Sequence, residues 1–297
     1  MSRFTRYAWI TLGYNLLVVL WGAFVRATGS GAGCGEHWPT CNGEVIPRAE
    51  TIQTMIEFTH RATSGIALLM TVALVIAAHR SFAPGHRVRR AAWTTLVFML
   101  AEALLGAGLV IFGLVENNDS VARALVMCMH LINTLALLGF MGLTAWWSAH
   151  PGRLDLHKPA ARVFGLALLG VFAIGVTGAI AALGDTLFPA KSLMEGIRAD
   201  LEPGAHFLLR LRGLHPVIAL LVSFGLFSLG RKYRAIPNLS ALSTTLIALV
   251  GLQVLVSFIN LGLLAPVYLQ LIHLLIADLV WLVLVILAAA ALESTNQ

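Results

Sequence analysis

Apolar residues gather in eight long stretches along the chain, and shorter polar segments separate them. A helix that crosses the hydrocarbon core of a bilayer needs about 20 predominantly apolar residues. Eight stretches meet that length: roughly 7–27, 54–78, 91–115, 122–147, 162–184, 208–229, 240–262 and 268–291. The pattern predicts an all-α integral membrane protein with eight transmembrane helices. Because the first stretch is long enough to span and lacks a cleavage site, we expect a membrane helix there, not a cleavable signal.

The composition indicates a surface that faces lipid. Of the 297 residues, 58% are hydrophobic and 11% are charged, whereas a soluble domain typically has about 25% charged residues. The net charge of +6 does not indicate a nucleic-acid partner, since the placement of charges matters more than their sum in a membrane protein. We therefore expect contact with the lipid bilayer and none with nucleic acid.

Basic residues in the loops predict the orientation, because cytoplasmic loops carry an excess of Lys and Arg. Of the 20 basic residues, 12 lie on one side of the predicted membrane. They are Arg3, Arg6, Arg80, Arg87, Arg89, Arg90, Arg153, Lys158, Arg162, Arg231, Lys232 and Arg234. We expect a bacterial inner-membrane protein with both termini in the cytoplasm. The two long loops, about 28–52 and 185–207, then face the periplasm.

An internal repeat divides the chain. A Gly-Ala pair near the end of the first stretch begins at Gly22 and recurs at Gly178, and both copies lead into a long outer loop. A histidine then stands early in the next helix of each half. We expect two pseudo-symmetric four-helix bundles, in residues 1–150 and 151–297. Parallel repeats are also common in transporters, so a transporter remains an alternative.

Four histidines lie at one depth of the predicted membrane, in the first third of the second, fourth, sixth and eighth stretches: His60, His130, His215 and His273. A neutral imidazole at that depth must form a hydrogen bond or ligate a metal, and histidine is a common axial ligand of haem iron. A lone membrane histidine is more often a packing residue. Two helices that present imidazoles at one depth, however, can clamp a flat macrocycle, so the pattern predicts one bis-histidine haem site per half, near the periplasmic side.

Haem brings two carboxylates, which arginine can pair at the membrane edge. Five arginines lie at the outer ends of predicted spans and are candidate propionate partners: Arg26, Arg61, Arg123, Arg210 and Arg212. Anchoring of the helix end by a snorkelling side chain is the alternative for each.

The two halves differ beside their first histidine. Glu57 stands three residues before His60 on the same helical face, whereas Arg212 stands three residues before His215. A carboxylate near a haem edge can accept a proton or stabilise positive charge. We therefore expect chemistry in the first half and a permanent haem in the second. The alternative is that Glu57 only forms a salt bridge with Arg61, four residues later.

Other polar residues lie within the predicted spans. Gln270 and Asn133 each stand three residues from a predicted histidine ligand and could orient its imidazole, although helix packing explains them as easily. The sequence indicates no partner for Asp278 and no role for Glu102.

The first outer loop contains Cys34 and Cys41 within a stretch rich in Gly and Pro. Disulfides persist outside the cytoplasm, and such a loop can bring the two thiols together. We expect a disulfide, with thiol exchange or a metal site that includes His37 as alternatives.

These motifs together resemble the haem A synthase family. The resemblance rests on Cys34–Gly43, Glu57–Arg61, Arg212–Pro216 and His273–Asp278, and on the eight spans in two halves. It implies an enzyme that oxidises the C8 methyl group of haem O to a formyl group, with oxygen from water, and so makes haem A.

The resemblance also implies roles for individual residues. His215 and His273 would ligate a resident haem b, His60 and His130 would frame the substrate haem, and Glu57 would be the catalytic carboxylate. Cys34 and Cys41 would be a redox pair. Haem O synthase, a farnesyltransferase, and cytochrome oxidase assembly factors would be partners.

One feature departs from that pattern. Some members of the family carry a second cysteine pair in the other outer loop, and residues 185–207 contain none. The main alternative function is a membrane cytochrome b that carries electrons without modifying haem.

Overall fold

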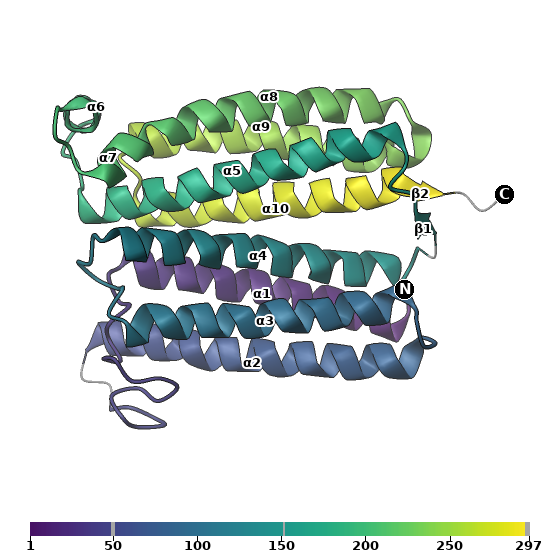
Figure 1. Cartoon of the computed structure of the whole chain (residues 1–297), viewed down its shortest axis with the longest axis horizontal. Coiled ribbons are helices and arrows are strands. Elements are labelled where there is room, and N and C mark those ends of the chain that lie inside the picture. Colours follow the sequence, from purple (N-terminus) through teal and green to yellow (C-terminus); the bar gives the residue numbers. More distant parts are fainter. Residues whose placement is uncertain (49–50, 151, 295–297) are drawn as a thin grey trace.

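The computed structural model describes residues 1–48, 51–150 and 152–294 and consists almost entirely of long helices that run up and down one axis (Figure 1). Part of the first outer loop, 49–50, and the predicted boundary of the halves at residue 151 lie outside the described residues. The first four helices are α1 (Arg3–Ala27), α2 (Ile52–Ser81), α3 (Arg87–Ile111) and α4 (Val121–Trp147). The later helices are α5 (Pro159–Leu187), α6 (Leu193–Leu201), α7 (Phe207–Arg212), α8 (Leu214–Arg234), the 3-10 turn η1 (Pro237–Leu239), α9 (Ser240–Gly262) and α10 (Val267–Leu292).

Small polar side chains begin several of these helices. Ser2, Thr51 and Ser120 each accept a hydrogen bond from a backbone N–H three residues later, which satisfies one of the unpaired donors of the first turn. Pro159 occupies the first turn of α5, where its missing N–H costs nothing. The polar segments between the apolar stretches therefore set where the helices begin.

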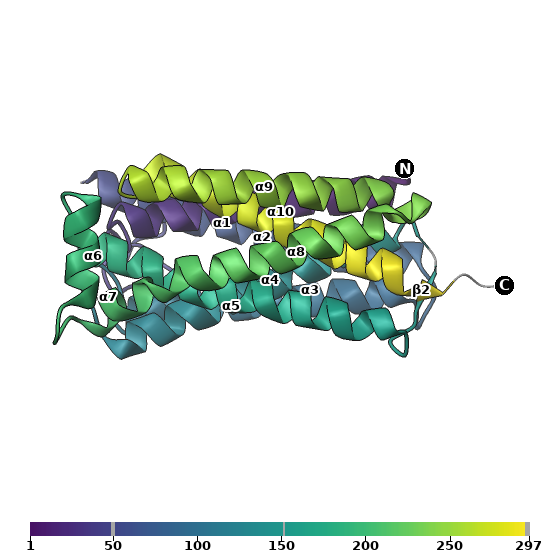
Figure 2. The same cartoon turned by 90° about the horizontal axis from the view of Figure 1, so that it is seen from above.

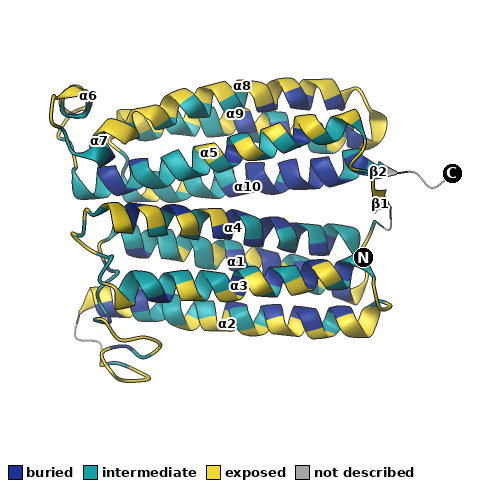
Figure 3. Cartoon of the chain, viewed as in Figure 1, coloured by how far each residue is buried: buried dark blue, intermediate teal, exposed yellow. Residues whose placement is uncertain are grey.

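The structure confirms the prediction of a helical membrane protein with eight spans. Within the described residues, eight helices are long and apolar enough to cross a bilayer, and the sixth and seventh combine α7 with α8 and η1 with α9. Large apolar side chains such as Leu69, Leu166 and Phe224 remain exposed on them. In Figure 3 exposed residues lie along the outer helix faces. This is the surface that lipid would cover.

Two details differ from the predicted spans. The predicted loop at 185–207 contains the short helix α6, which lies across the direction of the spans (Figures 1 and 2). The sixth span is also interrupted at Gly213, between α7 and α8. Pro216 explains that break, because proline lacks the N–H that would bond to the carbonyl of Arg212 and its ring clashes with that turn.

The spans form two rings of four helices. In the first ring α1 packs on α2, α2 on α3, α3 on α4 and α4 on α1, and in the second α5, α8, α9 and α10 pack in the same cyclic order. The rings lie side by side (Figure 1) and meet where α4 contacts α5 and α10, and where α1 contacts α10. These contacts are preserved if the two rings are exchanged, which is what a pseudo-twofold relation between the halves would produce.

Helices α4 and α10 form the centre of the seam. Trp281 of α10 donates its indole N–H to the carbonyl of Leu135 in α4 over 2.7 Å, and its ring lies against Gly139, where a Cβ would be 3.4 Å away. Both helices are buried more extensively than the others. The core therefore lies between the rings as well as inside them.

The two ends of the bundle differ. The N-terminus lies at one end, where β1 (Arg153–Leu154), in the segment that joins the rings, pairs with β2 (Glu293–Ser294) after α10. The long connections that follow α1 and α5 lie at the opposite end, here called the loop end (Figure 1).

Candidate functional site

The four predicted histidine ligands lie near the loop end. His60 in α2, His130 in α4, His215 in α8 and His273 in α10 each fall within the first ten residues of their span as counted from the loop end. All four are partly buried. Each histidine is thus at a similar distance along its helix from the loop end, in agreement with the predicted common depth.

The second half brings its two histidines together. The ring centroids of His215 and His273 are 6.4 Å apart, with ring planes inclined at 73°. An imidazole nitrogen binds a metal at about 2 Å, and its ring centroid lies roughly 1 Å further away, so imidazoles on opposite sides of one iron have centroids about 6 to 6.5 Å apart. The spacing of this pair suits axial ligation of a single haem iron.

Polar residues from the neighbouring helices surround this pair. The hydroxyl of Thr177 in α5 lies 3.2 Å from Nδ1 of His215. The amide nitrogen of Gln253 in α9 lies 3.3 and 3.2 Å from the two ring nitrogens of His273, and Ser257 lies 3.4 Å from its Nδ1. Iron binding through either nitrogen of His273 requires Gln253 to release that nitrogen.

A glycine accommodates one histidine ring in each half. A Cβ on Gly22 in α1 would lie 2.9 Å from Cε1 of His60, and a Cβ on Gly178 in α5 would lie 3.1 Å from Cε1 of His215. The separation at Gly22 is too short for any relaxed contact and the one at Gly178 is tighter than an ordinary contact, so a side chain at either position would displace the ring. The Gly22 and Gly178 runs that indicated a repeat thus serve the same purpose in the two rings.

The first half holds the other pair. His60 and His130 are its two predicted ligands, and the Nδ1 atom of each is buried without a hydrogen-bond partner among the described residues. An acid lies nearest to His130, since its Nδ1 is 3.4 Å from Oε1 of Glu102 in α3. A buried imidazole nitrogen without a hydrogen-bond partner is a suitable ligand atom for haem iron.

Both carboxylate oxygens of Glu57 accept hydrogen bonds. One carboxylate oxygen accepts the backbone N–H of Cys34 over 2.8 Å, and the other accepts two hydrogen bonds from Arg61. Its side chain is 4% exposed. The salt bridge between Glu57 and Arg61, which the sequence left as an alternative to catalysis, is present, and Glu57 is also bound to the cysteine loop.

Cys34 and Cys41 are joined in the structure and both are buried. Arg61 binds this loop, because its guanidinium donates to the carbonyls of His37 and Thr40 over 2.6 Å each. The loop, Arg61 and Glu57 therefore form one hydrogen-bonded unit over the first half. His37 takes part through its backbone.

The other arginines have different surroundings. Arg26 donates to the side chains of Thr186 and Gln270 in the second half, and Arg123 donates to the carbonyls of Glu116 and Asn118. Arg210 is exposed, and no partner is seen for it among the described residues. Whether any of them binds a propionate stays a prediction.

Arg212 is enclosed by acids that sequence reasoning did not identify. It donates to Asp200 in α6 at 2.5 Å and to Asp185 in α5 at 2.9 Å. It therefore holds α6 against the bundle and presents no free positive charge beside His215. The predicted contrast between an acid beside His60 and a base beside His215 relied on Arg212, whose charge is instead paired with Asp185 and Asp200.

Gln270 and Asn133 form hydrogen bonds between helices, the alternative that the sequence left open. Gln270 bonds to Arg26 and to the carbonyl of Ala265 and makes no hydrogen bond with His273. Asn133 reaches His130 only through Glu102. Asp278 is 1% exposed, and its Oδ2 has no partner in the described part of the chain.

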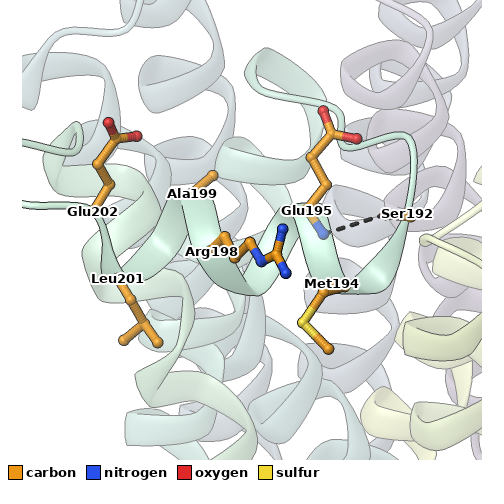
Figure 4. A pocket seen from close by; sticks show the side chains of 7 residues that line it. All are labelled: Ser192, Met194, Glu195, Arg198, Ala199, Leu201 and Glu202. Carbon is orange, nitrogen blue, oxygen red and sulfur yellow. Dashed lines mark hydrogen bonds between the residues drawn. The ribbon is translucent and has the colours of Figure 1, made fainter.

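A hollow beside α6 contains none of the predicted site residues. Figure 4 shows its lining: Ser192, Met194, Glu195, Arg198, Ala199, Leu201 and Glu202. All belong to α6 or its ends, at the loop end of the bundle. The candidate site is therefore the pair of histidine clusters.

Comparison with known proteins places the chain among proteins of cytochrome oxidase biogenesis. The COX15-CtaA family, described as a cytochrome oxidase assembly protein, matches residues 5–285. A protein of Thermus thermophilus named protoheme IX farnesyltransferase is 52% identical over 301 aligned positions, which cover 98% of this chain and 49% of that protein. The chain thus spans about half the length of that relative.

Haem A synthases of Bacillus are also similar over a shorter region. The enzyme of Bacillus mycoides is 40% identical over 114 residues, or 38% of this chain and 37% of that protein, and one of Bacillus cereus shows the same identity and coverage. The family match extends over most of the chain and agrees with the resemblance that the motifs indicated. The chain belongs to the COX15-CtaA family of cytochrome oxidase assembly proteins.

Proposed function

We propose that the chain is a haem A synthase, which oxidises the C8 methyl group of haem O to a formyl group. The observation that carries the proposal is the placement of two histidine pairs at one depth, with the His215 and His273 rings 6.4 Å apart. Membership of a cytochrome oxidase assembly family and the similarity to haem A synthases of Bacillus support the same activity.

The two halves would have different tasks. His215 and His273 would hold a resident haem b, while His60 and His130 would frame the substrate haem in the ring that also contains Glu57. Bound haem supplies the redox chemistry. The protein supplies orientation and proton handling, and an external acceptor takes the electrons. The domains 1–150 and 151–297 are proposed on this division.

Glu57 is the proposed proton acceptor of the first half. Each of its oxygens already accepts at least one hydrogen bond, but a carboxylate has about four lone-pair sites. Arg61 and the N–H of Cys34 hold the carboxylate in one orientation, and the cysteine loop covers it. Cys34 and Cys41 would stabilise that cover as a disulfide.

The location follows from the distribution of charge. Basic loops at the end that carries the N-terminus would lie in the cytoplasm, and the loop end would face the periplasm of a bacterial inner membrane. Haem O, supplied by a haem O synthase, would be the substrate. Arg26, Arg61, Arg123, Arg210 and Arg212 remain proposed propionate partners.

Two other functions call for a test. A cytochrome b that only carries electrons would also need histidine pairs, and the name of the Thermus relative raises farnesyl transfer to haem. Extraction and chromatography of the haems from membranes that contain this protein distinguish the three. Haem A formed from supplied haem O supports the proposal, haem O formed from haem b supports farnesyl transfer, and unchanged haem supports an electron carrier.

A further inference from the structure

Helix α3 presents an acid to the ligand histidine of the first half. Oε1 of Glu102 lies 3.4 Å from Nδ1 of His130. A Cβ on Gly106, one turn further along α3, would lie 4.0 Å from Cε1 of the same ring. Residues four apart lie on one helical face, so this face of α3 places Glu102 beside Nδ1 and leaves the space next to Cε1 free of a side chain.

The Glu102 carboxylate is held by donors on α4. It accepts the amide N–H of Asn133 and the hydroxyl of Thr134, each over 2.5 Å. A third neighbour, Nδ1 of His130, has no hydrogen-bond partner among the described residues and lies 3.4 Å from Oε1 of Glu102. A carboxylate surrounded by donors acts as an acceptor, so Glu102 is placed to accept a hydrogen bond from the Nδ1 N–H and leave Nε2 for a metal.

The second half has the same arrangement with a neutral side chain. An offset of 151 residues relates the ends of α3 and α9, at Ile111 and Gly262, and the same offset relates Glu102 to Gln253 and Gly106 to Ser257. Gln253 and Ser257 contact His273. In the first half Glu102 lies 3.4 Å from His130, and Gly106 has no side chain to reach the ring. The two rings thus place a carboxylate and its nearly isosteric amide at matching positions.

We propose that Glu102 is a positioning residue, which orients His130 as an iron ligand and gives the haem of the first half a lower reduction potential than a neutral partner would. The inference rests on the proposed haem site of the first half. A carboxylate that accepts the second N–H of a ligand imidazole makes the ligating nitrogen more basic, which favours the oxidised iron. Gln253 presents its amide nitrogen, a hydrogen-bond donor, to His273 and therefore does not make that ligand more basic.

Potentiometric titration of the purified full-length protein tests this, with protein from cells that make haem O. The absorbance is fitted as two components, which are assigned with His215→Ala because that variant lacks the resident haem. We expect Glu102→Gln to raise the midpoint of the first-half component and to weaken haem retention there about tenfold, within the range seen for such partners. The reciprocal variant, Gln253→Glu, should lower the midpoint of the resident haem, and Glu102→Asp should restore part of the original value.

The outcomes separate this inference from the proposed function. A wild-type protein without haem in the first half refutes the proposed function. Haem bound there with the same midpoint in Glu102→Gln overturns the role of Glu102. If Glu102→Gln loses its first-half haem altogether, the test is the midpoint of the resident haem in Gln253→Glu. A midpoint equal to that of the wild-type protein then overturns the inference.

Discussion

Nη2 of Arg26 donates to Oε1 of Gln270 over 2.8 Å, and this bond joins α1 of the first ring to α10 of the second. Nη1 of the same side chain donates to the carbonyl of Ala182 over 2.9 Å and to the hydroxyl of Thr186 over 2.8 Å. All three acceptors belong to the second ring. One guanidinium therefore ties the two rings together at the loop end, close to the proposed haem sites.

Arg26→Ala should destabilise the contact between the rings. It removes hydrogen bonds from a charged donor, which contribute about 1.5–3 kcal/mol each. The carbonyl of Ala182 keeps the hydroxyl of Thr186 as a donor, so we expect a loss of about 2–3 kcal/mol in the free energy of unfolding. Thermal loss of helical circular dichroism in detergent measures it. Arg48→Ala is the control, since that side chain is exposed and is not a proposed haem contact. Equal transition temperatures for Arg26→Ala and wild type would contradict this account of the seam.

Gly178→Ala should weaken binding of the proposed resident haem. A new Cβ 3.1 Å from Cε1 of His215 is tighter than an ordinary contact, so the imidazole must move by a few tenths of an ångström from its place opposite His273. The pyridine haemochrome assay gives haem per protein, and we expect this ratio to fall. Gly225→Ala is the matched control, because a Cβ there meets nothing within 4 Å. Full haem content in Gly178→Ala would show that this glycine is not a steric requirement of the site.

Glu57→Gln should abolish formation of haem A without affecting folding or haem binding. The amide oxygen can still accept the N–H of Cys34, while the charge that pairs with Arg61 is lost. We expect the variant to fold and bind haem but to yield no haem A, measured by chromatography of extracted haems. Glu36→Gln, in the exposed part of the same loop, should keep full activity. Normal haem A from Glu57→Gln would remove this residue from the proposed mechanism.

Replacing both loop cysteines with serine should loosen the cover over Glu57. A cross-link that closes a loop of this size constrains the unfolded chain by about 2–3 kcal/mol. We expect faster amide hydrogen exchange across residues 34–44 and unchanged exchange in the spans. Cys128→Ser is the control, because Cys128 is buried in α4 and far along the chain from the loop. Unchanged exchange in the loop of the double variant would show that Arg61 and Glu57 alone hold it.

Much of the fold could be predicted because hydrophobic length is a local property of the chain. The eight spans and the placement of the four histidines on them follow from the length of the apolar stretches, since a bilayer imposes that length on every helix. The break at Gly213 could have been expected from Pro216. The helix α6 was missed, because nine residues in a polar loop carry little signal.

The partners of each candidate residue could not be predicted in the same way. Helical spacing places Glu57 beside His60 and Arg61 along one helix, but the cysteine loop that binds its carboxylate lies before that helix, 23 residues earlier, where helical periodicity gives no position. The acids around Arg212, from α5 and α6, were missed for the same reason. Glu102 and Gln253 stand at equivalent repeat positions in the sequence. Only the structure shows that each side chain lies beside a predicted histidine ligand.

The sequence by itself determined that this is a membrane protein of eight helices with four histidines at one depth. Those properties depend on residue type and spacing within single segments, and the bilayer acts on each segment separately. Only the tertiary structure decided that Arg26 joins the rings, that Glu57 is bound to the cysteine loop, and that Glu102 faces His130. Such contacts depend on how packed helices are rotated about their axes, and that rotation is set by side-chain packing between segments far apart in the chain.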